Sequence, residues 1–111
     1  MNVQEKYQRL EDTVRQYNPG ANFDLIHAAF VYAEAHHRGQ NRKDGSPFIT
    51  HPLAVAQIVA QELHLDSESI AAALLHDTIE DTDATHEDIA RTFSPTIADI
   101  VEGVSKLTRV H

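Results

Sequence analysis

Residues 69–82 read "SIAAALLHDTIEDT", and the interpretation of the whole chain depends on this stretch. An apolar segment typical of a buried helix runs directly into four ionisable side chains, His76, Asp77, Glu80 and Asp81. Burying a carboxylate without a partner is energetically expensive. The cluster must therefore be solvated, be paired with other side chains, or hold a positive ion.

Apolar residues recur at helical spacing along nearly the whole chain, and no segment alternates as a strand would. Five or six helices are expected, over residues 3–17, 23–37, 52–63, 68–77, 86–93 and 96–107. The apolar face expected for the second of these consists of Leu25, Ala28, Ala29, Tyr32 and Ala33. The fold class is therefore predicted to be all-α.

Residues with strong positional preferences mark several of these boundaries. Asn22 is a suitable N-cap for the second helix. Pro52 is expected at the first position of the third helix, where its missing N–H costs nothing. Thr85 and Asp88 resemble a capping box, although Glu or Gln is the usual partner at the third position.

Length, charge and the absence of cysteine limit what the chain can be. Its 111 residues suffice for one small domain, and a net charge of -8 argues against a DNA partner. No apolar run could span a bilayer and the first residues lack a signal-peptide core, so we expect a cytoplasmic protein with no membrane partner. Without cysteine, any metal site must be built from histidine, carboxylate and water.

A candidate metal site can be built from His76, Asp77 and one more distant histidine. Adjacent helical residues point about 100° apart, so these two can share an ion only over the edge between them, or if the helix breaks there. His51, at the expected start of the third helix, is the candidate third ligand. Two imidazoles and a carboxylate suit manganese, iron or zinc better than calcium. Glu80 and Asp81, one turn further on, could orient a water or take its proton.

Each of these residues also has an ordinary structural interpretation. A His-Asp pair on a helix is more often a surface pair than a ligand set, and acids at a helix end are commonly solvated. We favour a metal site because His76 and Asp77 emerge from an Ala/Leu core segment. The other histidines are expected at the surface or at helix caps, namely His27, His36, His37, His64, His86 and His111.

The segment "GQNRKDGSPF", residues 39–48, is expected to be a loop that presents two basic side chains. A guanidinium such as that of Arg42 can stack on a base or bind phosphate in a forked geometry, whereas the Lys43 ammonium is a compact charge. A solubilising turn is the alternative. Because the loop leads within nine residues from Arg42 to His51, we expect its basic groups at the mouth of the metal site.

Three motifs together resemble a known family. The segments "AHHRGQNRKDGSPFITHPLAVAQIV", "AAALLHDTIEDT" and "IVEGVSKLTRV" are similar to the N-terminal hydrolase region of the RelA/SpoT homologues, which belong to the HD-domain metal phosphohydrolases. The resemblance runs from about residue 24 to the end of the chain. It implies a manganese-dependent hydrolase that removes the 3′-pyrophosphate of the alarmones ppGpp and pppGpp, giving GDP or GTP.

The resemblance also implies roles for individual residues. Positions that match His51, His76 and Asp77 bind the metal in the family, and those that match Glu80 and Asp81 handle the attacking water. Other positions of the family contact the nucleotide. The one that matches Arg42 packs on the guanine, and those that match Lys43 and Thr50 are further substrate contacts.

In one respect the chain departs from the family pattern. The family's domain continues past the "VSKLT" segment into helices with a fourth ligand, an Asp, and with an Asn that contacts the nucleotide; Asp99 does not match that ligand. We therefore expect residues 1–111 to form a compact helical HD-domain bundle that lacks its C-terminal helices, with weak metal affinity and little turnover.

Two other functions fit the same residues. The first is HD-type hydrolysis of a different nucleotide or phosphoester, for which Arg42→Ala should matter little, whereas an alarmone hydrolase should lose guanine-nucleotide affinity. The second is a non-enzymatic helical module that binds a nucleotide or a partner protein and regulates it. Nucleotide binding that is independent of metal would favour this module.

Overall fold

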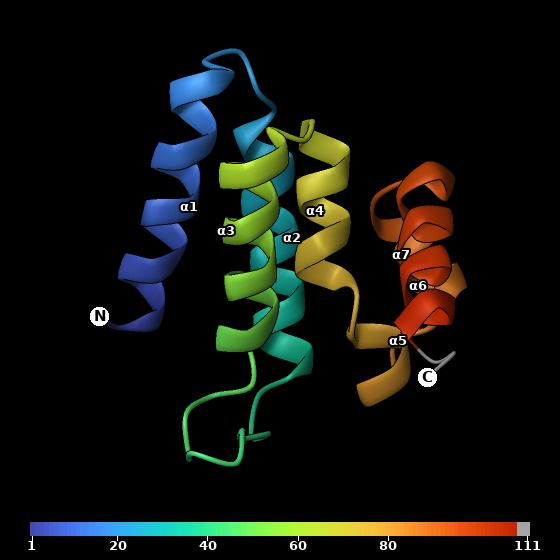
Figure 1. Ribbon diagram of the computed structural model, residues 1–111. Coiled ribbons are helices and arrows are strands. Elements are labelled where there is room, and N and C mark those ends of the chain that lie inside the picture. The colour runs from blue at the N-terminus through green and yellow to red at the C-terminus, as the bar shows by residue number, and fades with distance from the viewer. Residues whose placement is uncertain (109–111) are drawn as a thin grey trace.

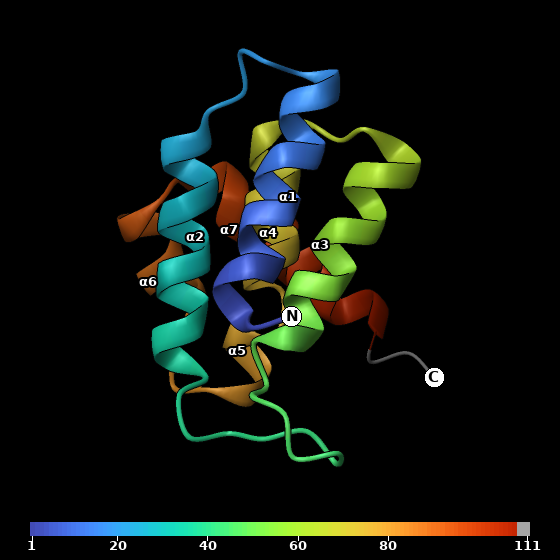
Figure 2. The ribbon, with the colours of Figure 1, turned by 90° about the vertical axis from the view of Figure 1, so that its left-hand side faces the viewer.

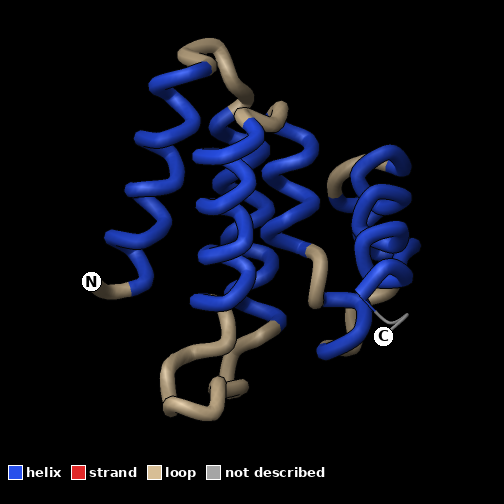
Figure 3. Tube along the Cα trace, in the orientation of Figure 1, coloured by secondary structure: helices blue, strands red, loops and turns tan. Residues whose placement is uncertain are grey.

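The computed structural model describes residues 1–108, and the chain in this range folds into seven helices (Figure 1). They are α1 (Val3–Tyr17), α2 (Phe23–His36), α3 (Thr50–Leu63), α4 (Ser67–Leu75), α5 (Thr78–Asp81), α6 (His86–Thr92) and α7 (Pro95–Thr108). Within residues 1–108 the one extended pairing is an isolated bridge between Asn41 and Pro47, in the loop between α2 and α3 (Figure 3). The all-α prediction is confirmed.

Helix α4 lies at the centre of the bundle. It packs against α2, α3 and α7, while α1 packs on α3 and α6 packs on α7. Figures 1 and 2 show α1, α2 and α3 on one side of α4, and the α6–α7 pair on the other. A helix surrounded in this way must be apolar on nearly every side, which is what the segment "SIAAALL" provides.

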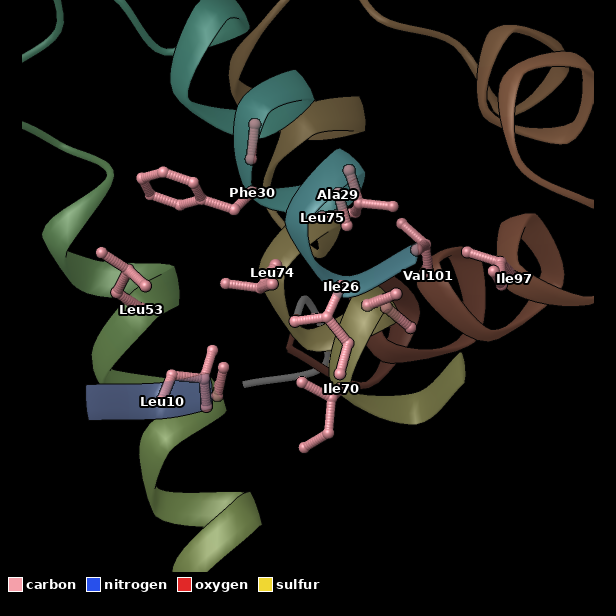
Figure 4. Packing of buried hydrophobic residues seen from close by; sticks show 14 of the residues in the cluster. Leu10, Ile26, Ala29, Phe30, Leu53, Ile70, Leu74, Leu75, Ile97 and Val101 are labelled. Carbon is pink, nitrogen blue, oxygen red and sulfur yellow. The ribbon is translucent and has the colours of Figure 1, made fainter. Parts of the chain in front are cut away.

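The core is a single cluster that contains both large and small apolar side chains (Figure 4). Ile70, Leu74 and Leu75 of α4 are fully buried, and Ile26 of α2 and Val101 of α7 are buried against them. Alanines of α2 and α4 complete the contact, and their small side chains allow two helix backbones to approach closely. None of the helices in residues 1–108 combines the length and apolar character needed to cross a bilayer.

Local capping signals fixed most helix starts correctly. The Asn22 side chain accepts a hydrogen bond from the Leu25 N–H (3.1 Å), and Thr85 and Asp88 form the expected reciprocal capping box. The expected position of Pro52 was wrong, because α3 begins at Thr50 and Pro52 is its third residue. The missing N–H is still harmless there, since the first four N–H groups of a helix have no partner within the helix.

The buried face of α2 differs from the expected one. Ala28 is exposed, and the fully buried stripe consists of Ile26, Ala29, Phe30 and Ala33. Apolar residues lie around most of this helix, so spacing alone could not choose between two neighbouring faces. This buried stripe matters for the candidate site, because the next residue on the same helix face is His37, at the end of α2.

The helix predicted over residues 68–77 ends two residues earlier, at Leu75, and a separate single turn, α5, follows. No Gly or Pro causes this break. Three side chains instead bind the carbonyl groups that the helix end leaves free. Thr78 Oγ1 donates to the Leu75 carbonyl (2.8 Å), and Ser105 Oγ of α7 donates to the His76 carbonyl (3.0 Å). His76 itself binds the Ala73 carbonyl through Nδ1 (2.7 Å).

Replacing a leucine of α4 should therefore destabilise the whole domain. Leu74→Ala is expected to lower the free energy of unfolding by about 3 kcal/mol, because it leaves a cavity in a fully buried position. Leu63→Ala is the matched control, since that side chain is 63% exposed, and should cost less than about 0.5 kcal/mol. Urea denaturation followed by circular dichroism measures both, and equal losses would contradict the central role of α4.

Candidate metal centre

Three side chains meet where α4 ends: His51, from the start of α3, and the adjacent residues His76 and Asp77. Asp77 Oδ2 lies 3.1 Å from His76 Nε2 and 3.3 Å from His51 Nε2. The centroids of the two imidazole rings are 5.6 Å apart, and the three side chains offer ligand atoms that all lie within 4.8 Å of one another. The structure thus brings together His51 and the His76–Asp77 pair. Their role as metal ligands remains a prediction.

The local fold explains how adjacent residues reach one point. His76 is the C-cap of α4 and Asp77 precedes α5, so the two adjacent residues lie at the break between these helices. His51 is the second residue of α3, which packs directly against α4. Of the two geometries considered from the sequence, a helix break is the one observed.

Hydrogen bonding leaves a lone pair of His76 facing a carboxylate oxygen. Because the Ala73 carbonyl can only accept, the hydrogen of the neutral His76 imidazole must be on Nδ1. Nε2 then presents a lone pair to Asp77 Oδ2, a buried oxygen with no hydrogen-bond partner among the described residues. Two acceptors in contact require a positive species between them, either a proton on Nε2 or a cation bound by both.

The pKa values of the three groups are shifted in different directions. Burial acts to raise the pKa of Asp77, but His76, then His51 and His37, outweigh it and lower the pKa, so the carboxylate stays ionised. Burial lowers the pKa of His51, which keeps its lone pair available. Burial also acts to lower the pKa of His76, but Asp77 and the Ala73 carbonyl reverse this and raise it.

The two acids predicted to handle water lie beside this centre on α5. Burial, followed by the charges of Asp77 and Glu80, raises the pKa of Asp81 above its usual range. A carboxylate with a raised pKa holds a proton more readily and is therefore a better general base. Asp81 also influences the pKa values of His51 and His76, which places its charge close to both. Glu80 is exposed on the same turn.

The loop before α3 is held as a tight hairpin, which fixes the position of Arg42. The Arg42 N–H donates to the Ser46 carbonyl (2.8 Å), and the Gly45 N–H donates to the Arg42 carbonyl (2.9 Å). Gly45 has φ +89°, a backbone conformation that residues other than glycine rarely adopt. The Arg42 charge makes a small contribution to lowering the pKa of His51, a shift whose main cause is burial.

The structure treats the other two predicted substrate contacts differently. Lys43 lies at the exposed tip of the hairpin. Thr50 is only 6% exposed, and its hydroxyl donates to the Pro47 carbonyl (2.8 Å), which anchors the hairpin to the start of α3. The Thr50 hydroxyl is therefore already used as a donor, and the predicted contact with substrate would have to use an oxygen lone pair.

Sequence reasoning missed a pair of residues that connect the loop to α5. His37 is 2% exposed, and its Nδ1 lies 3.0 Å from Gln40 Oε1. Gln40 Nε2 in turn donates to the Asp81 carbonyl (2.7 Å). The His37 ring also packs against Phe48, with centroids 4.6 Å apart, and Phe48 packs against His51. His37 is the C-cap of α2, which agrees with the expected surface or cap position, but its burial was not expected.

A signal for His37 was present in the sequence. Ile26, Phe30, Ala33 and His37 follow one another at intervals of four, three and four residues, which is the spacing of one helix face. Once Ile26 and Phe30 are recognised as the buried stripe, His37 becomes its polar continuation. A buried histidine in that position needs polar partners, and Gln40 supplies one.

The described histidines outside this centre behave as expected from the sequence. His64 is the C-cap of α3 in the left-handed conformation, and its ring stacks on Tyr17. His86 pairs at the surface with Asp99 (2.9 Å) and Glu102 (3.4 Å), and the Asp99 side chain is 74% exposed. Exposed pairs of this kind contribute little energy, so we treat them as surface ion pairs. His111 lies outside the described residues.

Comparison with known proteins agrees with this geometry. The family model described as "HD domain" matches residues 29–111, which include the histidines and the aspartate of the candidate centre. The chain belongs to the HD-domain family. HD domains bind divalent metals, and the partly buried His/His/Asp group has the ligand chemistry that such an ion requires.

The similar curated proteins are members of the RelA/SpoT family. The chain is 48% identical over 101 residues to the GTP pyrophosphokinase rsh of Brucella melitensis, covering 91% of this chain and 13% of that protein. It is 44% identical over 104 residues to the bifunctional (p)ppGpp synthase/hydrolase SpoT of Escherichia coli K12, covering 94% and 15%. The same figures apply to the guanosine-3′,5′-bis(diphosphate) 3′-pyrophosphohydrolase of Escherichia coli O157:H7. The chain thus spans about one seventh of these relatives' length.

The contact between Gln40 and Asp81 should contribute to stability as well as to the shape of the site. Gln40→Ala is expected to lower the free energy of unfolding by about 1–2 kcal/mol, because it removes two hydrogen bonds worth about 1 kcal/mol each. Asn41→Ala is the control, since within residues 1–108 this exposed amide makes no side-chain hydrogen bond. Denaturation curves in urea measure both, and an unchanged midpoint for Gln40→Ala would show that the link is not formed in solution.

Proposed function

We propose that this chain is part of a metal-dependent hydrolase that removes the 3′-pyrophosphate of ppGpp and pppGpp, giving GDP or GTP. One observation supports the proposal above all. Two imidazole nitrogens lie within 3.3 Å of a buried carboxylate oxygen that has no hydrogen-bond partner among the described residues, and Asp81, with its raised pKa, lies beside them. A phosphohydrolase needs this combination of a cation site and a base.

The residues of the chain would divide the chemistry among them. His51, His76 and Asp77 would hold Mn²⁺, and a bound divalent ion supplies Lewis acidity toward water and toward a phosphoryl oxygen. Asp81 would accept the proton of the attacking water, and Glu80 would help to orient it. The water oxygen bonds to the phosphorus on the ribose 3′ oxygen, that P–O bond breaks, and the leaving oxygen takes up a proton.

The names of the relatives include both synthesis and hydrolysis of the alarmone, so they do not choose between the two activities by themselves. The matched region favours hydrolysis. It is an HD domain with two histidines and an aspartate around one point and two further acids on the next helical turn, which suits water activation. We propose that the synthetic activity named in these relatives belongs to other parts of their chains.

We also propose that residues 1–111 form one wall of the complete site. Three ligands leave coordination positions open for water, substrate or a further side chain. The relatives are far longer than the matched segment, and the rest of such a chain could supply the additional ligand and nucleotide contacts. Turnover by residues 1–111 alone is therefore expected to be weak, whereas metal binding should be measurable.

Metal binding should stabilise the fold. Mn²⁺ at roughly a hundred times its Kd should add about 2.7 kcal/mol to the free energy of unfolding, because the ion binds only the folded chain. In Asp77→Asn this gain should vanish, since the amide keeps the shape but loses the charge. Asp24→Asn, an exposed acid on α2, is the matched control and should keep the full gain. Thermal denaturation with and without Mn²⁺ measures this gain in stability. An unchanged melting temperature of the native chain in the presence of Mn²⁺ would rule out this centre.

Hydrolysis is best tested in a chimera in which this chain replaces the 104 aligned residues of the Escherichia coli K12 relative. With Mn²⁺ and ppGpp the chimera should release pyrophosphate. Asp81→Asn should lower kcat by roughly a hundredfold or more through loss of the base, while the nearby exposed Asp83→Asn should leave it unchanged.

A chimera that binds Mn²⁺ and is folded by circular dichroism, yet releases no pyrophosphate, would contradict the alarmone hydrolase. Hydrolysis of other nucleotides by the same preparation would then favour an HD enzyme with a different substrate. Nucleotide binding that needs no metal, with no hydrolysis of any of them, would favour the regulatory module.

A further inference from the structure

A cavity of about 330 Å³ lies between α1 and α3, next to the start of α3. Its lining includes Lys6, Arg9, Arg42, Thr50, Leu53 and Ile58. Figure 2 shows these two helices side by side, with the beginning of α1 near the beginning of α3. Its volume is within the range of small-ligand pockets. The proposed hydrolase does not account for the α1 side of this cavity.

The charge of the cavity is opposite to that of the chain. Lys6, Arg9 and Arg42 line it, and no Asp or Glu is among its lining residues in the part of the chain that the structure describes. This occurs in a protein with a net charge of -8. Three cations around one small volume repel one another unless an anion lies between them.

The basic residues elsewhere behave differently. Each of Arg15, Arg38, Arg91 and Lys106 forms an ion pair with an acid three or four residues before it, at distances between 2.7 and 3.6 Å. Within residues 1–108, the basic side chains that have no such ion pair are Lys6, Arg9, Arg42 and Lys43, and the first three of them line this cavity. The cavity therefore gathers nearly all the cations that the fold leaves unneutralised.

The fold holds these side chains in place from two directions. Tyr7 and Leu10 are buried on the face of α1 that packs into the bundle, and Lys6 and Arg9 are the residues directly before them. Their positions, three apart, put both on the same edge of α1. Arg42 comes from the opposite direction on the hairpin, whose backbone hydrogen bonds fix it. Leu53, Ala54 and Ile58 of α3 add an apolar side.

We propose that this cavity is a phosphate-binding site, in which Lys6, Arg9 and Arg42 together hold a phosphate group of a nucleotide. Phosphate is the common ligand of clustered Lys and Arg, because its oxygens accept several charge-assisted hydrogen bonds at once. The apolar side of the cavity suits the uncharged part of the same molecule. The site requires no metal, so it does not depend on the proposed hydrolysis.

The cavity and the metal centre lie on either side of the first turn of α3. Thr50 lines the cavity, whereas the next residue, His51, faces Asp77. Two sources of the phosphate follow from this arrangement. It is either a phosphate of the same nucleotide that reaches the metal centre, which rests on the proposed function, or a phosphate of a separate ligand.

The anion site itself is tested with inorganic pyrophosphate, titrated calorimetrically into the full chain in the presence of EDTA. The Lys6→Gln/Arg9→Gln variant should bind roughly a hundredfold more weakly, about tenfold for each lost charged contact. The Arg91→Gln/Lys106→Gln variant is the matched control, because it removes the same charge from exposed residues of α6 and α7, and should bind as the native chain does. No pyrophosphate binding by the native chain, or equal binding by both variants, would overturn the proposal.

The variants should fold normally, since Arg9 is exposed, Lys6 is partly so, and Gln is a good helix former. Should Lys6→Gln/Arg9→Gln nevertheless unfold, as circular dichroism would show, Arg42→Gln in the hairpin provides a second variant with an expected loss of roughly tenfold.

The source of the phosphate is decided by titrating ppGpp into the Mn²⁺-loaded chain. A parallel loss of ppGpp affinity in Lys6→Gln/Arg9→Gln assigns the phosphate to the substrate nucleotide. Unchanged ppGpp affinity, with pyrophosphate binding still lost, assigns it to a separate ligand. Both results support the anion site. Neither measurement depends on turnover. A failure of the proposed hydrolysis would therefore be detected separately, in the chimera, and would not contradict the anion site.

Discussion

The candidate centre depends on how α4 ends. Three carbonyl groups at its C-terminus, those of Ala73, Leu75 and His76, each accept a hydrogen bond from a side chain. These bonds satisfy groups that would otherwise be buried without partners, so the helix stops between Leu75 and Thr78 without a glycine or proline. The break turns Asp77 toward His51, and the same bonds fix the tautomer of His76. The hydrogen bonds that end α4 therefore also orient the candidate ligands.

One of these hydrogen bonds connects the candidate site to the part of the core formed by α7. Ser105, which binds the His76 carbonyl, is a residue of α7, and α7 is held by Ile97 and Val101 packing into the main apolar cluster. Disturbing the contact between α4 and α7 would therefore release a carbonyl of the metal centre as well as expose apolar surface. On the opposite side, Gln40 binds the Asp81 carbonyl and orders the acids in a similar way. Ser105 and Gln40 thus hold the candidate site from both sides without belonging to its His51, His76 and Asp77 group.

Sequence reasoning succeeded where the signals were local. Helix periods, the Asn22 cap and the Thr85–Asp88 capping box depend on residues within one turn of one another, and the structure agrees with them. The α4 break depends on Ser105, some thirty residues away, and has no local signal. The burial of the cap residue His37 was missed because α2 is apolar on more than one face. The cavity combines α1, the hairpin and α3, so no single segment of the sequence could reveal its charge.

The positive cavity also shows why net charge was an incomplete guide to ligands. At physiological ionic strength the Debye length is about 8 Å, so distant surface acids are screened and the nearest charges dominate what a ligand experiences. An anion in the cavity would meet Lys6, Arg9 and Arg42, while most acids of the chain lie beyond the lining. Arg42 belongs to both regions, because it lines the cavity and also acts on His51. A net charge of -8 therefore argues against a long polyanion such as DNA, and leaves room for a small phosphorylated molecule held by local cations.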